Sequence, residues 1–311
     1  MSTTKKAIPS SMVGSLFIIA SALAFGSYGV FSRYLENYDV FFQTYVRCLM
    51  VAAVLAIFGV VKHQFKPIAR KDWGWFATVL LFTTFCIAPI TYAYRFLTLG
   101  VASFLFYSSV TVFSYLFGFL FFKEKWTRIK MLSLGLSVLG MLLIFSLQTS
   151  AVLLIPALLV LFNGLASSGE VTFSKKISNS YSSTQITFLI FAVIGISHLL
   201  LSLVVGETQD SRLFTQSFPI MLLFVVASLL GMITVVEGFK RVEPSIGTIL
   251  GLTEIVFSVV IGIVLFAEKM TFPVLLGGAC ILIAAILPNI QPLQQYLSNR
   301  HGKGHDNTLV S

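Results

Sequence analysis

Four ionisable residues lie inside long apolar segments, where a charge must either perform a task or be neutralised. They are Arg47, Glu170, Glu237 and Glu254. A charged side chain at the centre of a bilayer costs roughly 2.5–3.5 kcal/mol on insertion scales, so such residues usually bind a substrate, carry a proton or pair with a partner. Each of the four is therefore a candidate site residue.

Glu254 is the strongest of these candidates. It follows Pro244 by ten residues, which corresponds to about 15 Å along a helix and brings it close to the middle of a bilayer. A carboxylate there could alternate between holding a proton and pairing with a cationic group of a substrate, so we expect Glu254 to serve both substrate binding and proton coupling. The alternative is a buried carboxylate that hydrogen-bonds to another helix.

The other three charges have competing explanations. Arg47 could hold a substrate carboxylate with its two-pronged guanidinium, or it could pin helices together through a carboxylate or backbone carbonyls. Glu170 is a second candidate for proton coupling. However, Glu170 and Glu237 lie within about one or two helical turns of Lys175 and Lys240, so pairing at the membrane interface is the simpler explanation for both.

Polar aromatic side chains and one amide could complete a binding cavity around weakened helices. Pro89 removes a backbone hydrogen bond, and Gly231, the equivalent residue 142 positions later, lowers helix stability. We therefore expect helix breaks at Pro89 and Gly231. The side chains expected to bind substrate near them, besides Glu254 and Arg47, are Tyr28, Tyr92, Tyr94, Tyr107 and Asn163. For any one aromatic, packing against lipid or another helix is the alternative.

Membrane-spanning helices are the elements that must position these residues. The 311-residue chain is 57% hydrophobic and 11% charged, with a mean hydropathy of +0.92, whereas soluble domains carry about 25% charged residues. Its apolar runs are long enough to cross about 30 Å of hydrocarbon as helices. The expected spans are 11–32, 41–61, 73–95, 98–122, 128–147, 151–174, 184–205, 217–239, 244–267 and 272–290.

The basic residues between the spans predict the orientation. With a cytoplasmic N-terminus, 16 of the 21 Lys and Arg residues fall in cytoplasmic segments, four fall outside, and Arg47 lies within a helix. This bias follows the positive-inside rule and explains the net charge of +9 without a nucleic-acid partner. We expect an integral plasma-membrane protein, of the bacterial inner-membrane kind, with both termini cytoplasmic.

An internal repeat divides the chain into two halves. Polar and aromatic residues recur 142 or 144 positions later, among them Phe31 as Phe173, Gln43 as Gln185, Phe113 as Phe257, Glu124 as Glu268 and Lys125 as Lys269. Because each half has five predicted helices, the second half would insert upside down relative to the first. We predict an all-α integral membrane protein of ten transmembrane helices in two inverted repeats, 1–148 and 149–291, with a short polar cytoplasmic tail, 292–311.

Several segments carry a resemblance to a known family. They are Phe122-Lys123-Glu124-Lys125 and its echo Phe266-Ala267-Glu268-Lys269, Arg47 in TYVRCL, the run 242–260, and Gly277-Gly278. In order and spacing they resemble the EamA family of the drug/metabolite transporter superfamily, although Ile255 stands after Glu254 where the family often has proline. The resemblance implies an alternating-access carrier, commonly an exporter of amino acids or related metabolites driven by protons or exchange. It marks Glu124 and Glu268 as features of the fold.

The function predicted from these observations is secondary-active transport of a small amino-acid-like or zwitterionic metabolite, either proton-coupled or by exchange. We expect no enzymatic activity, no cofactor and no metal site, with a small-molecule substrate and membrane lipids as partners. The sequence leaves open whether the protein is a monomer or a homodimer. The alternative is an intramembrane enzyme acting on a lipid or isoprenoid, which would need clustered His, Asp or Glu residues; a sensor or receptor is a third possibility.

Overall fold

The computed structural model describes residues 10–123, 127–145, 151–207, 211–242, 247 and 250–287, and these residues form helices and no strands. Glu124, Lys125, Pro244 and the predicted tail 292–311 lie outside the described residues. The helices are α1 (Ser10–Gly26), α2 (Tyr28–Tyr34), α3 (Val40–Val61), the 3₁₀ turn η1 (Arg70–Asp72), α4 (Trp73–Thr83), α5 (Ala88–Ala93), α6 (Leu99–Phe122), α7 (Arg128–Phe145), α8 (Ala151–Ser174), α9 (Ser183–Val205), α10 (Ser211–Phe239), α12 (Thr253–Phe266) and a last helix, Phe272–Leu287.

Helix length and composition identify an integral membrane protein. Within the described ranges, seven helical segments are long and apolar enough to cross a membrane, and the shorter apolar helices Thr253–Phe266 and Phe272–Leu287 follow them. The seven are Ser10–Tyr34, Val40–Val61, Arg70–Ala93, Leu99–Phe122, Leu153–Ser174, Ser183–Val205 and Gln216–Phe239. Helix α7 occupies the predicted fifth span. A total of ten crossings remains a prediction.

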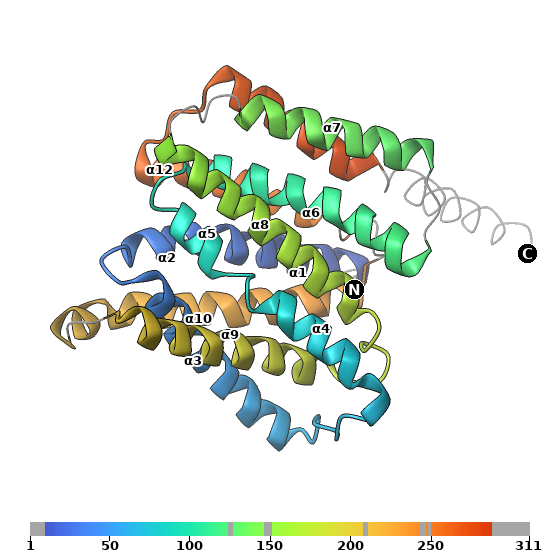
Figure 1. The fold of residues 1–311 in the computed structure, drawn as a ribbon, viewed down its shortest axis with the longest axis vertical. Helices are drawn as coiled ribbons and strands as arrows, with labels where there is room; N and C mark the ends of the chain where they lie inside the picture. Colours follow the sequence, from blue (N-terminus) through green and yellow to red (C-terminus); the bar gives the residue numbers. More distant parts are fainter. Residues whose placement is uncertain are drawn as a thin grey trace, which may run out of the picture.

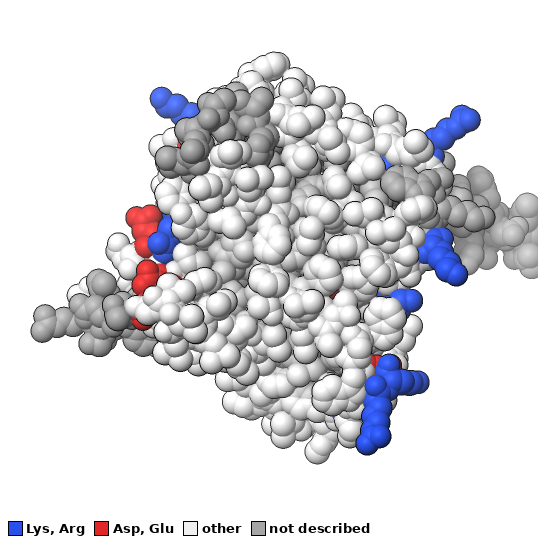
Figure 2. All heavy atoms as spheres, in the orientation of Figure 1, with Lys and Arg blue, Asp and Glu red and all other residues white. Residues whose placement is uncertain are grey.

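The helices lie side by side, with α3 along α9, α6 along α8 and α1 along α10 (Figure 1). We call the end of the bundle at which α1, α4 and α9 begin the near end, and the opposite end the far end. The near end is on the right in Figure 1. In the same orientation, Lys and Arg side chains gather mainly at this end, and a broad uncharged surface separates the two ends (Figure 2). That surface has the composition of a lipid-facing belt.

Helix α7 and the last helix touch at two places, and the internal repeat relates one contact to the other. A Cβ atom built at Gly140 would lie 2.6 Å from the Gly277 carbonyl oxygen, so the backbones touch there. The Ser133 hydroxyl donates a 2.5 Å hydrogen bond to the Ala284 carbonyl. Adding the repeat offset of 144 to Ser133 and Gly140 gives Gly277 and Ala284, so each contact maps onto the other. This reciprocity is expected for two halves related by a twofold axis.

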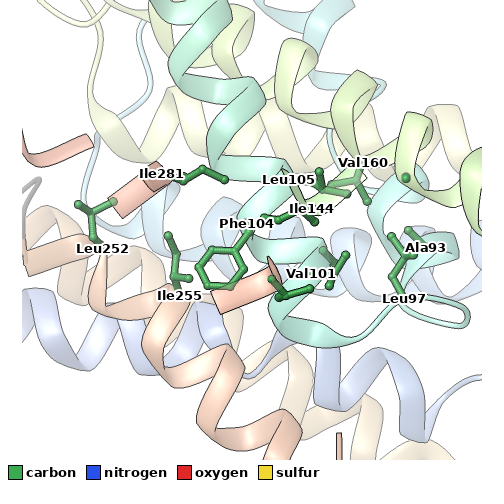
Figure 3. Close-up of a cluster of buried hydrophobic side chains, with 13 residues drawn as sticks. Ala93, Leu97, Val101, Phe104, Leu105, Ile144, Val160, Leu252, Ile255 and Ile281 are labelled. Atoms are coloured by element: carbon green, nitrogen blue, oxygen red, sulfur yellow. The ribbon is translucent and has the colours of Figure 1, made fainter. Parts of the chain in front are cut away.

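The main apolar core fixes α6 against α12 and the last helix. Figure 3 shows Phe104 of α6 beside Ile255 of α12, with Ile281 of the last helix nearby. Phe104 also fills the space that a side chain at Gly278 would occupy. Because packed side chains leave little room for sliding, this core sets the position of α6 relative to α12.

The first span contains a break that the sequence did not predict. Helix α1 ends at Gly26, and the Val30 amide donates to the Ser27 carbonyl at 3.0 Å. The Gly26 carbonyl instead accepts a 3.2 Å hydrogen bond from the Ser258 hydroxyl of α12. A Cβ at Gly26 would lie 2.9 Å from the Glu254 carbonyl oxygen. Glycine at this position therefore allows α1 to cross close to α12.

The third span is interrupted next to Pro89. Helix α4 ends at Thr83, and α5 begins at Ala88 with Pro89 in its first turn. Proline has no amide hydrogen, so it cannot donate to the carbonyl of Phe85 four residues earlier. The side-chain amide of Asn163 supplies that donor at 3.2 Å. A side chain of the second half therefore satisfies the backbone carbonyl that the helix break in the first half leaves without a donor.

The break expected at Gly231 is not seen. Helix α10 runs without interruption from Ser211 to Phe239, because a glycine keeps the amide donor that a proline lacks. The missing side chain serves packing instead, since a Cβ at Gly231 would lie 2.5 Å from the ring of Phe25. The two halves thus differ at this pair of equivalent positions.

Candidate functional site

A central cavity of about 260 Å³ lies among helices of both halves. It brings together six of the predicted substrate-binding residues, Tyr28, Arg47, Tyr94, Tyr107, Asn163 and Glu254. The remaining lining residues are Phe25, Ser32, Cys86, Ile87, Ile90, Thr91, Ser103, Phe106 and Phe224. The wall is thus mainly aromatic and apolar, with a small number of polar groups, as in binding sites for small molecules.

A second cavity, of about 430 Å³, lies toward the near end. We call it the near cavity; its lining includes Ile18 and Ser21 of α1, Ser114 of α6, and Val235 and Phe239 of α10. Three residues line both cavities: Phe25, Tyr107 and Glu254. These three side chains therefore stand at the boundary between the cavities.

A short hydrogen bond joins two of the boundary residues. The Tyr107 hydroxyl of α6 donates to Oε2 of Glu254 in α12 at 2.5 Å. Hydrogen bonds to a carboxylate are shorter and about twice as strong as bonds between neutral groups. The bond thus holds Glu254 at a defined place between the two cavities.

The Tyr107–Glu254 pair lies where equivalent parts of the two halves meet. The repeat offset of 144 relates Tyr107 to Gly251 and Val110 to Glu254, and all four residues line the near cavity. Helices α6 and α12 therefore face each other through equivalent positions, as they must near an axis that relates the halves. The acid is present in only one half, because Val110 occupies the equivalent position in the other.

Arg47 is a buried cation in the wall of the central cavity. Its side chain is 2% exposed, and its guanidinium carbon lies 4.0 Å from the ring centre of Phe224 and 5.1 Å from that of Tyr28. Within the described part of the chain, no carboxylate forms an ion pair with Arg47 and its Nε has no hydrogen-bond partner. Aromatic faces compensate a buried guanidinium only in part, so it retains the capacity to bind an anion.

Asn163 presents one unused acceptor in the same wall. Its Nδ2 donates to the Phe85 carbonyl, and its Oδ1 has no hydrogen-bond partner among the described residues. The residue is 1% exposed. A buried polar atom without a partner is costly, so Oδ1 is suited to accept a hydrogen bond from a bound ligand.

Three predicted or considered residues lie away from both cavities. Tyr92 packs against Phe96, with ring centres 5.1 Å apart, and lines neither cavity. Glu170 accepts a hydrogen bond from Thr83. Glu237 forms ion pairs of 2.6 Å with both Lys240 and Arg241, which matches the interfacial pairing considered for it.

An ion pair at the far end was not anticipated from the sequence. Nη2 of Arg33 lies 2.7 Å from Oε1 of Glu268, and Nε of Arg33 donates to the Tyr94 carbonyl at 3.0 Å. Glu268 also accepts the Leu99 amide at 2.9 and 3.0 Å, which satisfies the start of α6. This network ties the end of α2 to the start of α6 and to the residues after α12. The repeated Glu-Lys motif was the only sequence signal for it.

Sequence reasoning also missed the apolar wall of the central cavity. Phe25, Phe106 and Phe224 line it, but 30 phenylalanines are distributed along the chain. In a membrane protein, an apolar side chain can face lipid, another helix or a cavity with the same periodicity. No signal in the sequence separates these three environments.

Comparison with known proteins gives one family and one fold. The model of the EamA-like transporter family matches residues 12–146 and 154–290. A solved crystal structure of a protein superposes with a TM-score of 0.61 over 88% of this chain and 96% of the other chain, at 12% identity; at that identity the likeness concerns the fold alone. No curated protein matches the chain.

Proposed function

The chain belongs to the EamA-like transporter family, as its motifs predicted, and from this premise we propose that it is a secondary-active carrier of a small zwitterionic, amino-acid-like metabolite. We propose further that its ten helices form two inverted repeats that give the substrate alternating access to the two sides of the membrane. The observation that carries the proposal is one small cavity with Arg47 and Glu254 in its wall.

The two charged side chains explain why a zwitterion would bind. Arg47 presents a guanidinium without an ion-pair partner among the described residues, and such a group binds a carboxylate through two parallel hydrogen bonds. Among the described residues, the Glu254 carboxylate is held only by Tyr107, a neutral donor, so a substrate ammonium group could pair with it. The volume of about 260 Å³ suits a small metabolite better than a lipid.

The boundary position of Glu254 supports alternating access. Glu254 and Tyr107 line both the central and the near cavity. If the halves rock about the axis near this pair, the site stays in place while its access changes from one side of the membrane to the other. A substrate bound to Glu254 could therefore leave through the near cavity without a second binding site.

Glu254 also offers a route for coupling. When no substrate is present, the carboxylate can hold a proton or accept the Tyr107 hydroxyl, and a substrate ammonium group would compete with that proton. Transport would then run either with proton movement or as exchange of one substrate for another. Import and export both fit this scheme, because the gradients set the direction.

We propose that the protein lies in a plasma membrane of the bacterial inner-membrane kind. In this orientation, the near end of the bundle faces the cytoplasm. The concentration of basic side chains at the near end supports this orientation (Figure 2). Cysteine labelling of intact cells with a membrane-impermeant reagent tests it. A cysteine placed at Lys62, at the near end, should be protected, and one placed at Glu36, at the far end, should react.

The deciding experiment is a ligand-stabilisation screen of the purified protein followed by flux in proteoliposomes at two internal pH values. The screen should contain standard L-amino acids, their carboxamides, the matching amines, nucleosides and methylated cofactors. Zwitterions should raise the melting temperature and move across the membrane, while carboxamides and amines should not. If no small solute binds or moves, the carrier assignment fails; if amines move as well as zwitterions, the role of Arg47 fails.

A further inference from the structure

Glu170 is half-buried in a polar cluster between α8 and the break in the third span. Its Oε2 accepts a hydrogen bond from the Thr83 hydroxyl at 3.0 Å. The Cys86 thiol donates to the Phe82 carbonyl at 3.3 Å and lies beside the same carboxylate, and Cys86 also lines the central cavity. The carboxylate is thus one side chain away from the proposed substrate site.

Among the described residues, no positive charge compensates Glu170. The helices packed against α8 are α4, α5 and α6, and their sequences contain no Asp, Glu, Lys, Arg or His. The titratable groups on these helices are Tyr92, Tyr107 and Tyr115, and Cys86 lies in the break between α4 and α5. Lys175 and Lys176 directly follow α8, the helix that carries Glu170, and both are exposed. A half-buried carboxylate whose described neighbours are neutral is most readily accommodated when it binds a proton.

The internal repeat predicts a second environment for Glu170 in the alternate conformation of the carrier. The offset of 142 relates Tyr28 to Glu170 and Phe82 to Phe224. Tyr28 lines the central cavity and its ring contacts Phe224 at a centroid distance of 5.0 Å. In the equivalent contact, Phe82 of the first half packs onto Gly169, next to Glu170 of the second half. When inverted halves exchange conformations, equivalent residues exchange surroundings, so Glu170 would take the cavity-facing position now held by Tyr28.

We propose that Glu170, with Thr83 and Cys86, is a second protonation site of the carrier, distinct from Glu254, which opens to the transport path when the two halves exchange conformations. The inference rests on the proposed function and deepens it by adding a second proton to the cycle. The ligand is a proton and not an ammonium group, because Glu170 lines neither cavity and its Oε2 already accepts the Thr83 hydroxyl. The carboxylate takes the proton from water on one side of the membrane and returns it on the other.

The first experiment measures the protonation of Glu170 in the absence of a substrate. Infrared difference spectra of the protein in liposomes are recorded between mildly acidic and mildly alkaline pH, in the carboxylic-acid carbonyl region. Glu170→Gln should remove one titrating band that remains in Glu254→Gln, and Thr83→Val should shift that band by removing its hydrogen-bond donor. Glu237→Gln, the same chemical change at a carboxylate paired with Lys240 and Arg241, should leave the band unchanged.

The second arm reads proton movement during transport. Proteoliposomes containing a pH-sensitive dye receive a mixture of the standard L-amino acids, and the ratio of protons to amino acid moved is measured. Glu170→Gln should lower this ratio by about twofold relative to the unchanged protein, since one of two proton carriers is lost. Glu237→Gln should not change it.

The outcomes separate this inference from the proposed function. If the unchanged protein moves no amino acid, the proposed function fails, while the infrared arm still reports whether Glu170 titrates. If the unchanged protein transports and Glu170→Gln alters neither the band nor the ratio, the second protonation site is refuted. Should Glu170→Gln fail to fold, Thr83→Val decides, because it leaves the carboxylate in place: a band that does not shift also refutes the site.

Discussion

The Tyr107 hydroxyl in the first repeat donates a 2.5 Å hydrogen bond to Glu254 in the second, at the boundary of two cavities. The bond joins α6 to α12, the helices that face each other through equivalent positions. A change at either residue should therefore affect substrate affinity and the exchange between conformations together. The predictions below begin with this pair.

Replacing Glu254 by Gln should abolish coupled transport while leaving the protein folded. Glutamine keeps the shape and can still accept the Tyr107 hydroxyl, but it can neither titrate nor attract an ammonium group. Amino-acid uptake by proteoliposomes under a proton gradient should fall by about tenfold or more. Near-normal uptake by this variant would exclude Glu254 from the site.

Replacing Tyr107 by Phe removes the donor to Glu254 without changing the ring. A hydrogen bond to a charged group contributes about 1.5–3 kcal/mol, so the affinity for a zwitterion should change by about tenfold or more. Tyr92→Phe is the matched control, because Tyr92 lines neither cavity. Binding is measured by isothermal titration calorimetry; equal effects of the two substitutions would argue against a specific role for Tyr107.

Arg47→Gln should remove selectivity for a carboxylate. The unchanged protein should transport an amino acid in preference to its carboxamide, because only the carboxylate compensates the buried guanidinium. In the variant, the ratio of kcat/KM for acid over amide should fall by about tenfold or more. Arg47→Lys keeps the charge but not the two-pronged geometry, and should give an intermediate ratio. Competition assays with both solutes measure it, and an unchanged ratio would mean that Arg47 is structural.

Asn163 and Pro89 should be coupled in stability. Asn163→Ala leaves the Phe85 carbonyl without its donor and should lower the free energy of unfolding by about 1–3 kcal/mol. Pro89→Ala restores an amide that can donate to the same carbonyl. The double variant should therefore recover much of the lost stability, as a thermal or denaturant double-mutant cycle would reveal. Additive losses would show that the Asn163 bond does not compensate for Pro89.

Arg33→Ala should destabilise the far end. Glu268 has a side chain that is 5% exposed, and removing its partner leaves a nearly buried charge, at a cost of about 3–5 kcal/mol. Changing both residues to apolar ones, Arg33→Met with Glu268→Leu, should cost less than Arg33→Ala alone, although the start of α6 loses its acceptor. The melting temperature in detergent gives the ranking. A smaller loss for Arg33→Ala than for the double variant would contradict the buried-pair interpretation.

Periodicity and composition predicted the helices well, because a lipid-crossing segment must be long, apolar and internally hydrogen-bonded. The ten predicted spans or their parts can be followed in α1 to α10, α12 and the helix Phe272–Leu287. The break at Ser27 could not be predicted, since it depends on the Ser258 hydroxyl reaching a carbonyl 232 residues away in the chain. Local sequence does not encode which distant donor will satisfy a carbonyl.

The candidate site was predictable where charge made it conspicuous. Arg47 and Glu254 stand out because ionisable residues are rare in apolar segments, and the structure brings both to one cavity. Tyr92 was selected because it lies near Pro89 in the chain, but a helix of only six residues directs it elsewhere. Two of the residues that form the cavity, Phe25 and Phe224, differ from other phenylalanines only in their three-dimensional position.

The broken helices of the first half are completed by the second. The Gly26 carbonyl is satisfied by Ser258, the Phe85 carbonyl by Asn163, and Arg33 by Glu268. During synthesis, the first half therefore enters the membrane with backbone and charged groups that have no final partner until the rest of the chain arrives. A truncated first half should be recognised as incomplete and degraded, and co-expression of the missing half should rescue it.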